Sequence, residues 1–279
     1  MTFITAVVCV HNQHDVARRC IDSLAGDLPA DAEILVIDDA SRPRFEYTGN
    51  RPVTVLRNPR RQGYTRSANR GLRASTSDII LLANSDTVFP SGSVAGLVAV
   101  LENGADLCSP LSNAASWQSV PAKLSSSGNW TANLTIAAGD ASQLNEIVRR
   151  VSRRDHPRVP LLNGFCLAMA ASVLNTIGYF DESCFPTGYG EEDDFCIRAG
   201  EAGFRCVIAD DVFVFHEKSM SFGHLARRWH SRRGGRALNR KWGRDRIDRL
   251  VSEMRDNATL AYMRDAVAKE WSRAKATRD

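Results

Sequence analysis

The run most suited to chemistry is residues 188–198, GYGEEDDFCIR, which holds four consecutive carboxylates: Glu191, Glu192, Asp193 and Asp194. Like charges repel, and a helix N-terminus, whose dipole favours negative charge, explains only one or two of them. On a helix Glu191 and Asp194 share a face, while Glu192 points elsewhere. We expect one carboxylate to face a cleft, where its neighbours raise its pKa and let it accept a proton from a substrate hydroxyl. The others would cap the helix or pair with Arg198.

Two further acidic groups follow apolar runs that are typical of buried strands. Asn84 and Asp86, in LLANSDTVF, offer oxygen ligands of the kind that Mg²⁺ or Mn²⁺ takes together with substrate phosphates. Asp39, in ILVIDDAS, is suited to accept hydrogen bonds from a nucleotide base or ribose. A turn or a helix cap is the alternative explanation for both groups, because Asn, Ser and Asp are common turn residues.

A cluster of arginines lies between these two acidic groups: Arg57, Arg60, Arg61, Arg66, Arg70 and Arg73. Gly63 precedes a predicted helix, and helix N-termini and guanidinium groups both favour diphosphate oxygens. We expect Arg66 to contact a diphosphate and several of the others to form a solvated helix face. His216, at the end of the last predicted strand, is a candidate metal or phosphate ligand, with a structural histidine as the alternative.

The elements that must position these residues alternate between apolar strands and helices. Strands are predicted at 3–10, 33–38, 53–56 and 78–83, and helices at 14–26, 64–75 and 91–103. Strands that are apolar throughout and alternate with helices indicate βαβ units around a mostly parallel sheet. In such sheets ligands bind beyond the carboxyl ends of the strands, so the polar groups that follow the strands are expected to converge.

The second half of the chain is less regular. A long loop is expected at 109–135, a stretch rich in Ser, Asn and Ala that is either functional or disordered. Beyond it we expect a helix at 141–154, a strand at 161–172, a short helix, the acidic helix, and final strands within 205–216.

Composition narrows the class of protein. The chain has 279 residues, 43% of them hydrophobic and 24% charged, which suits one large domain or one domain with an extension. A formal net charge of only +4 gives no global basic field of the kind that nucleic-acid binding needs. The first apolar run, about eight residues long, is too short for a signal peptide or a membrane span, so we expect a cytoplasmic protein. Seven scattered cysteines without a CxxC pair predict free thiols.

The tail from residue 224 to residue 279 is strongly basic and interleaved with tryptophans, and its last part has helical periodicity. We therefore divide the chain into a domain at 1–223 and a basic, mostly helical extension at 224–279. One possibility is that the extension lies on an anionic membrane surface, where each Lys or Arg contributes on the order of 1 kcal/mol to the binding free energy. The other is that it is a solvated helical segment that supports a homodimer.

Together and in this order, these segments resemble a family 2 glycosyltransferase with the GT-A fold. The resemblance rests on VVCVHNQHDVARRCIDSL, EILVIDDAS, the stretch 57–89, the stretch 162–216 and LNRKWG. It covers most of residues 3–243. Within the family, the chain looks like the rhamnosyltransferase-like enzymes that build bacterial surface polysaccharides. The resemblance implies inverting transfer from a nucleotide-diphosphate sugar, assisted by Mg²⁺ or Mn²⁺, to a glycan or a lipid-linked glycan at the inner face of the membrane.

The resemblance also assigns roles to single residues. Asp39 falls where the family contacts the nucleotide base, with Asn12 nearby. NSD falls on the family's DxD motif, so Asp86 would bind the metal, while Asn84 takes the first acidic position and removes one charge. GEEDDF falls on G-E-D-x-D-L, which makes Glu192 the catalytic base, one methylene longer than the family's Asp. The flanking carboxylates of that motif match Glu191 and Asp194.

The acceptor side is assigned more loosely. Gly188 and Tyr189 would shape the acceptor pocket, and Trp117 or Trp130 would stack on a sugar. The 109–135 loop would act as a lid that orders on donor binding.

Two other functions remain open from the sequence. A nucleotidyltransferase is expected to carry a glycine-rich phosphate loop after the first strand, where this chain has VHNQHD. A non-catalytic sugar-nucleotide-binding protein is compatible with the asparagine in NSD.

Overall fold

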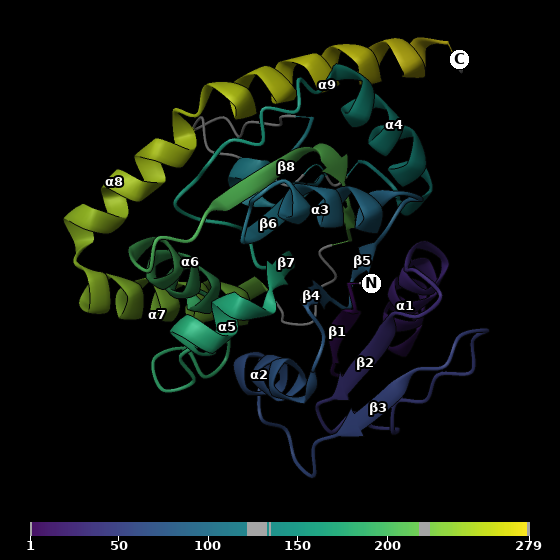
Figure 1. Cartoon of the computed structure of the whole chain (residues 1–279), viewed down its shortest axis with the longest axis vertical. Coiled ribbons are helices and arrows are strands. Elements are labelled where there is room, and N and C mark those ends of the chain that lie inside the picture. The colour runs from purple at the N-terminus through teal and green to yellow at the C-terminus, as the bar shows by residue number, and fades with distance from the viewer. Residues whose placement is uncertain (1, 122–132, 134, 218–223, 278–279) are drawn as a thin grey trace.

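The computed structural model describes residues 2–121, 133, 135–217 and 224–277, and it forms an α/β fold around one central sheet (Figure 1). The sheet has seven strands in the order β3-β2-β1-β4-β7-β6-β8. They are β1 (Ile4–Val10), β2 (Glu33–Asp38), β3 (Thr54–Arg57), β4 (Ile79–Asn84), β6 (Leu107–Leu111), β7 (Cys166–Ala170) and β8 (Cys206–Phe213). Only β7 runs antiparallel to its neighbours, so the mostly parallel sheet expected from the sequence is confirmed.

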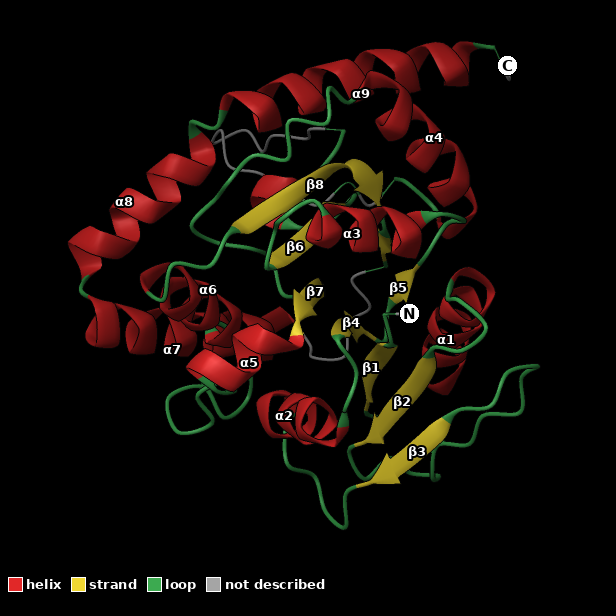
Figure 2. Ribbon diagram, in the orientation of Figure 1, coloured by secondary structure: helices red, strands yellow, loops and turns green. Residues whose placement is uncertain are grey.

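Helices cover both faces of the sheet, as Figure 2 shows. On one face α1 (His14–Asp27) and α3 (Ser93–Glu102) pack on one apolar cluster. On the other face α2 (Tyr64–Ala74), α4 (Ala141–Val151) and α6 (Glu191–Glu201) pack on a second cluster. Residues of β1 alternate between the two clusters, Val7 in one and Val8 in the other. Apolar side chains are needed on both faces, which explains the unbroken apolar runs of the sequence.

One expectation for the second half of the chain is corrected. Residues 109–111, expected as the start of a loop, belong to the buried strand β6, where the polar atoms of Ser109 and Pro110 accept hydrogen bonds from Gln118. The final strands expected within 205–216 are present as β8, in which buried Asp210 accepts hydrogen bonds from Ser152 and His156, and the short β9 (Phe215–His216). Residues 122–132 and 134 of the expected lid, Trp130 among them, lie outside the described residues.

The basic tail is helical, as expected, and it packs against the rest of the protein. It forms α7 (His224–Trp242), α8 (Arg244–Arg255) and α9 (Ala258–Ala276), and Figure 1 shows α9 lying along α4. Met263, Val267 and Trp271 of α9 belong to the same buried cluster as the sheet. The division at residue 223 stays a prediction, but the tail shares the core of the sheet. Within the described part of the chain, no helix is both long enough and apolar enough to cross a bilayer.

All seven cysteines are free thiols, as the scattered pattern predicted. Six of them are buried or half-buried, and only Cys184 is exposed. The short helix α5 (Ala171–Ile177) follows β7 directly.

Candidate active site

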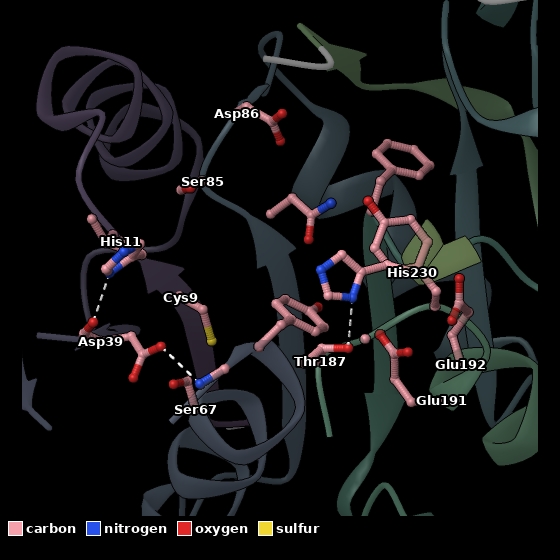
Figure 3. Close-up of a pocket in the computed structure, with 18 of the residues that line it drawn as sticks. Cys9, His11, Asp39, Ser67, Ser85, Asp86, Thr187, Glu191, Glu192 and His230 are labelled. Atoms are coloured by element: carbon pink, nitrogen blue, oxygen red, sulfur yellow. Dashed lines mark hydrogen bonds between the residues drawn. The ribbon is translucent and has the colours of Figure 1, made fainter. Parts of the chain in front are cut away.

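A cavity of about 640 Å³ opens where β1, β2 and β4 end, opposite the start of α6 (Figure 3). Its walls therefore come from strand ends that are far apart in the sequence, as the sheet topology requires. The predicted site residues that line it are Asp39, Asn84, Asp86, Gly188, Tyr189, Glu191, Glu192 and His216. The convergence expected from the sequence is present in the structure.

Two of the four consecutive carboxylates, Glu191 and Glu192, face this cavity from the first turn of α6. Their carboxyl groups are hydrogen bonded to each other, and the backbone N–H of Gly190 donates to Glu192 Oε2 at 3.0 Å. Buried Glu191 Oε2 has no partner. Burial, and then the charge of Glu192, raise the pKa of Glu191 well above its usual range, and burial also raises the pKa of Glu192. The pair is therefore built to hold one proton between two carboxyl groups.

Asp194 has a different role from the one expected. Its side chain is fully buried and accepts hydrogen bonds from Arg198 Nε at 2.9 Å and Trp242 Nε1 at 2.8 Å, with Lys241 Nζ 2.7 Å away. These three donors turn the carboxylate away from the cavity and tie α6 to the end of α7. Asp194 therefore anchors α6 to α7, and the expected pairing of one carboxylate with Arg198 is present.

Asp86 and His216 lie next to each other in the wall of the cavity. β5 (Thr87–Val88) pairs with β9 in antiparallel register, and this places His216 Nε2 3.3 Å from Asp86 Oδ1. His216 Nδ1 lies 2.9 Å from the carbonyl oxygen of Ala114, so Nδ1 must donate its hydrogen there. Nε2 is left facing the carboxylate, and an imidazole nitrogen beside a carboxylate oxygen is a ligand pair that a divalent cation accepts.

These residues fit a divalent metal. The described residues contain no group of three or more His, Cys, Asp or Glu side chains suited to a metal, so within them Asp86 and His216 form a pair of ligands and no larger set. Mg²⁺ and Mn²⁺ accept such a site when water and substrate phosphates complete the coordination. Asn84 lines the cavity beside them with a neutral side chain.

Asp39 lines the cavity, and its carboxylate organises the neighbouring loop. It accepts hydrogen bonds from Asn58 Nδ2 at 2.8 Å, Gln62 N at 2.7 Å and Gly63 N at 2.9 Å. The arginine-rich loop is thereby held against the end of β2. Asn12 is exposed and does not line the cavity, because its Oδ1 accepts from the backbone of Arg42.

Arg66 is not brought to the cavity. Its side chain is 49% exposed and lies 3.7 Å from Glu182, on the outer side of α2. Arg61 lines the cavity instead. Arg61 belongs to the loop whose next residues, Gln62 and Gly63, are bound by Asp39, whereas Arg66 lies in the first turn of α2.

Trp117 is also kept away from the cavity. Its ring packs against the core and stacks with Arg255 of α8, 5.7 Å from the ring centroid. Its carbonyl oxygen accepts a hydrogen bond from Arg264 of α9 at 3.0 Å. The tail therefore uses Trp117 as packing surface, and the residue does not line the site in which it was expected to stack on a sugar.

A sequence model of the family described as glycosyl transferase family 2 matches residues 5–174, more than half of the chain. This chain belongs to glycosyl transferase family 2. The matched region contains the Asp39 and Asp86 side of the cavity. The carboxylates of α6 and the residues of the tail follow after it.

The family 2 chain has distant similarity to two curated relatives. It is 27% identical over 106 residues to an uncharacterised glycosyltransferase of Haemophilus influenzae, an alignment that covers 37% of this chain and 36% of the relative. It is 26% identical over 218 residues to the pre-mycofactocin glycosyltransferase of Mycobacterium tuberculosis, which covers 77% of this chain and 42% of the relative. The chain thus spans well under half the length of the curated relatives it matches.

Two solved structures share the fold. A mannosyltransferase of Pyrobaculum calidifontis, in complex with GDP-Man and Mn²⁺, has a TM-score of 0.59 at 18% identity, covering 98% of this chain and 75% of that one. GalNAc-T7, solved with UDP, GalNAc and Mn²⁺, has a TM-score of 0.57 at 17% identity, covering 77% and 44%. These similarities confirm the GT-A fold of the family 2 chain.

Among the residues that line the cavity, Tyr64 and His230 were given no role by the sequence reasoning. His11, which follows the first strand together with Asn12, also lines it, as expected of a residue at a strand end. Tyr64 is the first residue of α2, and burial raises its pKa well above the usual range. Nothing in the local sequence of the basic tail distinguishes His230 from its neighbours, because its place depends on how α7 packs.

Proposed function

We propose that this family 2 chain transfers a sugar, with inversion, from a nucleotide-diphosphate donor to an acceptor hydroxyl. The observation that supports this most strongly is the placement of two kinds of group in one cavity. A carboxylate and an imidazole suited to a metal, Asp86 and His216, line it together with a carboxyl pair suited to proton transfer, Glu191 and Glu192.

Glu192 acts as the base in this proposal. Glu191 keeps the shared proton and donates it in a hydrogen bond to Glu192, which raises the pKa of Glu191 and lowers that of Glu192 against the effect of burial. Glu192 then takes the proton of the acceptor hydroxyl. The acceptor oxygen forms a bond to the anomeric carbon, and the bond from that carbon to the diphosphate oxygen breaks on the opposite face. Its electron pair stays on the leaving diphosphate.

Asp86 and His216 would hold the divalent metal, with Asn84 beside them. When bound, the metal supplies positive charge against the negative charge that develops on the leaving diphosphate. Arg61 lines the same cavity and adds a guanidinium to that side. The presence of Mn²⁺ with GDP-Man in the mannosyltransferase of similar fold supports this placement.

The acceptor is proposed to be a glycan or a lipid-linked glycan of the bacterial cell envelope, as in rhamnosyltransferase-like enzymes. The exposed arginines of the tail support contact with an anionic membrane, and they include Arg232, Arg233, Arg236, Arg240, Arg244 and Arg249. Co-flotation with vesicles that contain anionic lipid, but not with neutral vesicles, is expected. Flotation with neither type, together with a dimer in analytical ultracentrifugation, would favour a homodimer role for the tail.

The decisive test is a panel of nucleotide sugars assayed for transfer and hydrolysis with and without Mn²⁺. Transfer or hydrolysis that requires Mn²⁺ and releases a nucleoside diphosphate supports the proposal. Release of pyrophosphate would instead indicate a nucleotidyltransferase. Binding without turnover of any donor would indicate a non-catalytic sugar-nucleotide-binding protein, and a thermal-shift screen against nucleoside diphosphates detects that binding independently.

A further inference from the structure

The tail contributes one side chain to the cavity. His230, in α7, lines it together with Thr187 and Tyr189 of the loop that precedes α6. In Figure 3 the His230 ring lies between Asp86 on one side and Glu191 and Glu192 on the other. A residue of a predicted extension thus occupies the region between the proposed diphosphate side and the proposed base.

The position of the ring is fixed by two contacts. His230 Nδ1 is 3.1 Å from Thr187 Oγ1, within hydrogen-bond distance. The ring also stacks on Tyr189, with centroids 6.0 Å apart and planes 9° from parallel. Both partners belong to the loop that carries the carboxyl pair into place, so the imidazole and Glu192 are held by the same segment.

The loop has an unusual backbone that presents Tyr189 to this ring. Gly188, Tyr189 and Gly190 all have positive φ, at 88°, 68° and 110°. Positive φ is uncommon for tyrosine, and such a conformation persists only where the surroundings impose it. α7 supplies part of those surroundings, because a Cβ at Gly234 would lie 1.7 Å from the carbonyl oxygen of Tyr189. The backbone of α7 is therefore pressed directly against the loop.

The charge state of the ring is also constrained. Burial, together with nearby Arg233 and Arg61, lowers the pKa of His230. A neutral imidazole has one donor and one acceptor nitrogen, so it can both give a hydrogen bond to a hydroxyl group and accept one from it. A protonated imidazole could only donate. A charged group for the diphosphate is already supplied by Arg61, which lines the same cavity.

We propose that His230 hydrogen bonds to a hydroxyl of the transferred sugar ring, so that α7 is a wall of the active site and a determinant of donor specificity. The inference rests on the proposed function, since it places the sugar between Asp86 and Glu192. His230 is a positioning and specificity residue here, and Glu192 remains the base.

The test compares three substitutions at one position. His230→Ala removes the ring, His230→Phe keeps a ring to stack on Tyr189 but removes the nitrogens, and His230→Asn keeps hydrogen-bonding atoms. Ser231→Ala, a substitution at an exposed residue of the same helix, is the matched control. The measurements are the affinities for the nucleotide sugar and for its nucleoside diphosphate by calorimetry, kcat and KM for transfer, and the thermal midpoint.

Loss of one hydrogen bond to the sugar should lower kcat/KM about 10- to 100-fold in His230→Ala and His230→Phe. Affinity for the nucleoside diphosphate, which lacks the sugar, should change less than about 2-fold, and His230→Asn should recover part of the loss. Ser231→Ala should behave like the unsubstituted protein.

Three results would overturn the inference. The first is unchanged kcat/KM in His230→Ala. The second is an equal fall in affinity for nucleotide sugar and nucleoside diphosphate, which would assign His230 to the phosphates. The third is equal activity of His230→Phe and the unsubstituted protein, which would show that the ring acts only by packing on Tyr189. Failure of the unsubstituted protein to turn over any nucleotide sugar would instead reject the proposed function, and the role of His230 with it.

Discussion

Two acidic regions line or adjoin the same cavity, and they are built in opposite ways. At the end of β2, Asp38 and Asp39 are surrounded by donors, with Arg57 and Ser41 on Asp38 and three N–H groups on Asp39. At the start of α6, Glu191 and Glu192 face each other with few donors. Burial raises the pKa of Asp38, but the hydrogen bonds outweigh it and lower that pKa. Asp38 is therefore held as a charged carboxylate, while the carboxyl pair of the second region can exchange a proton.

The largest effect should follow from removing the proton acceptor. Glu192→Gln is expected to lower kcat by about 10²- to 10⁴-fold, the usual contribution of a general base. Nucleotide affinity should stay nearly unchanged, because Asp39 and Arg61 are untouched. Steady-state transfer and calorimetry check this, with Glu201→Gln at the exposed end of α6 as the matched control. Near-normal turnover of Glu192→Gln would remove this residue from the role of base.

For stability the ranking of the two regions should be reversed, with the larger loss at the end of β2 and the smaller at the start of α6. Asp38→Ala leaves Arg57 and the N–H of Ser41 without their partner and should cost about 3 kcal/mol of the free energy of unfolding. Glu191→Gln removes an acid whose burial is poorly compensated, so the free energy of unfolding should stay equal or rise. Urea unfolding of both variants, with exposed Asp31→Ala as control, measures the contrast. Equal losses in the two regions would contradict it.

A smaller effect should separate the two arginines of the donor side. Arg61→Ala is expected to raise the donor KM about 10-fold, as for the loss of one charge-assisted contact. Arg66→Ala should change the KM less than about 2-fold, because its partner is Glu182 outside the cavity. The reverse ranking in donor kinetics would restore Arg66 to the diphosphate site.

The smallest effect is a pH dependence of stability. The pKa values of Glu191 and Glu192 are raised in the folded protein, and that of Asp193 rises to about 8 through burial and the charge of Glu192. Above the usual carboxyl range, the folded state therefore binds more protons than the unfolded state, and stability falls as pH rises from about 4.5 toward 8. Urea unfolding at pH 5 and pH 8 should show a smaller fall in Glu191→Gln. An identical change of unfolding free energy with pH in the variant and the unsubstituted protein would show that the pKa of Glu191 is not raised in the folded state.

The strands and helices were predicted well from the sequence, whereas the positions of individual side chains were predicted in some cases only. Strands such as β1 and β4 were predictable because apolar residues face both sides of the sheet. β6 was missed because Ser109 and Pro110 interrupt its apolar run, and their partner Gln118 is a tertiary contact. The strand-end position of Asp86 was enough to place it. The placements of Arg66 and Asp194 depend on Glu182 and on α7, and neither can be derived from the local pattern.

The pairing of β5 with β9 brings Thr87 beside His216, although a long stretch of chain separates them. During synthesis, the ribosome therefore releases the Asp86 turn long before its imidazole partner. A nascent chain that has exposed only the first four strands carries the Asp86 turn without His216 and without the α6 carboxylates. The proposed donor site can therefore be assembled only after the second half of the chain has been synthesised.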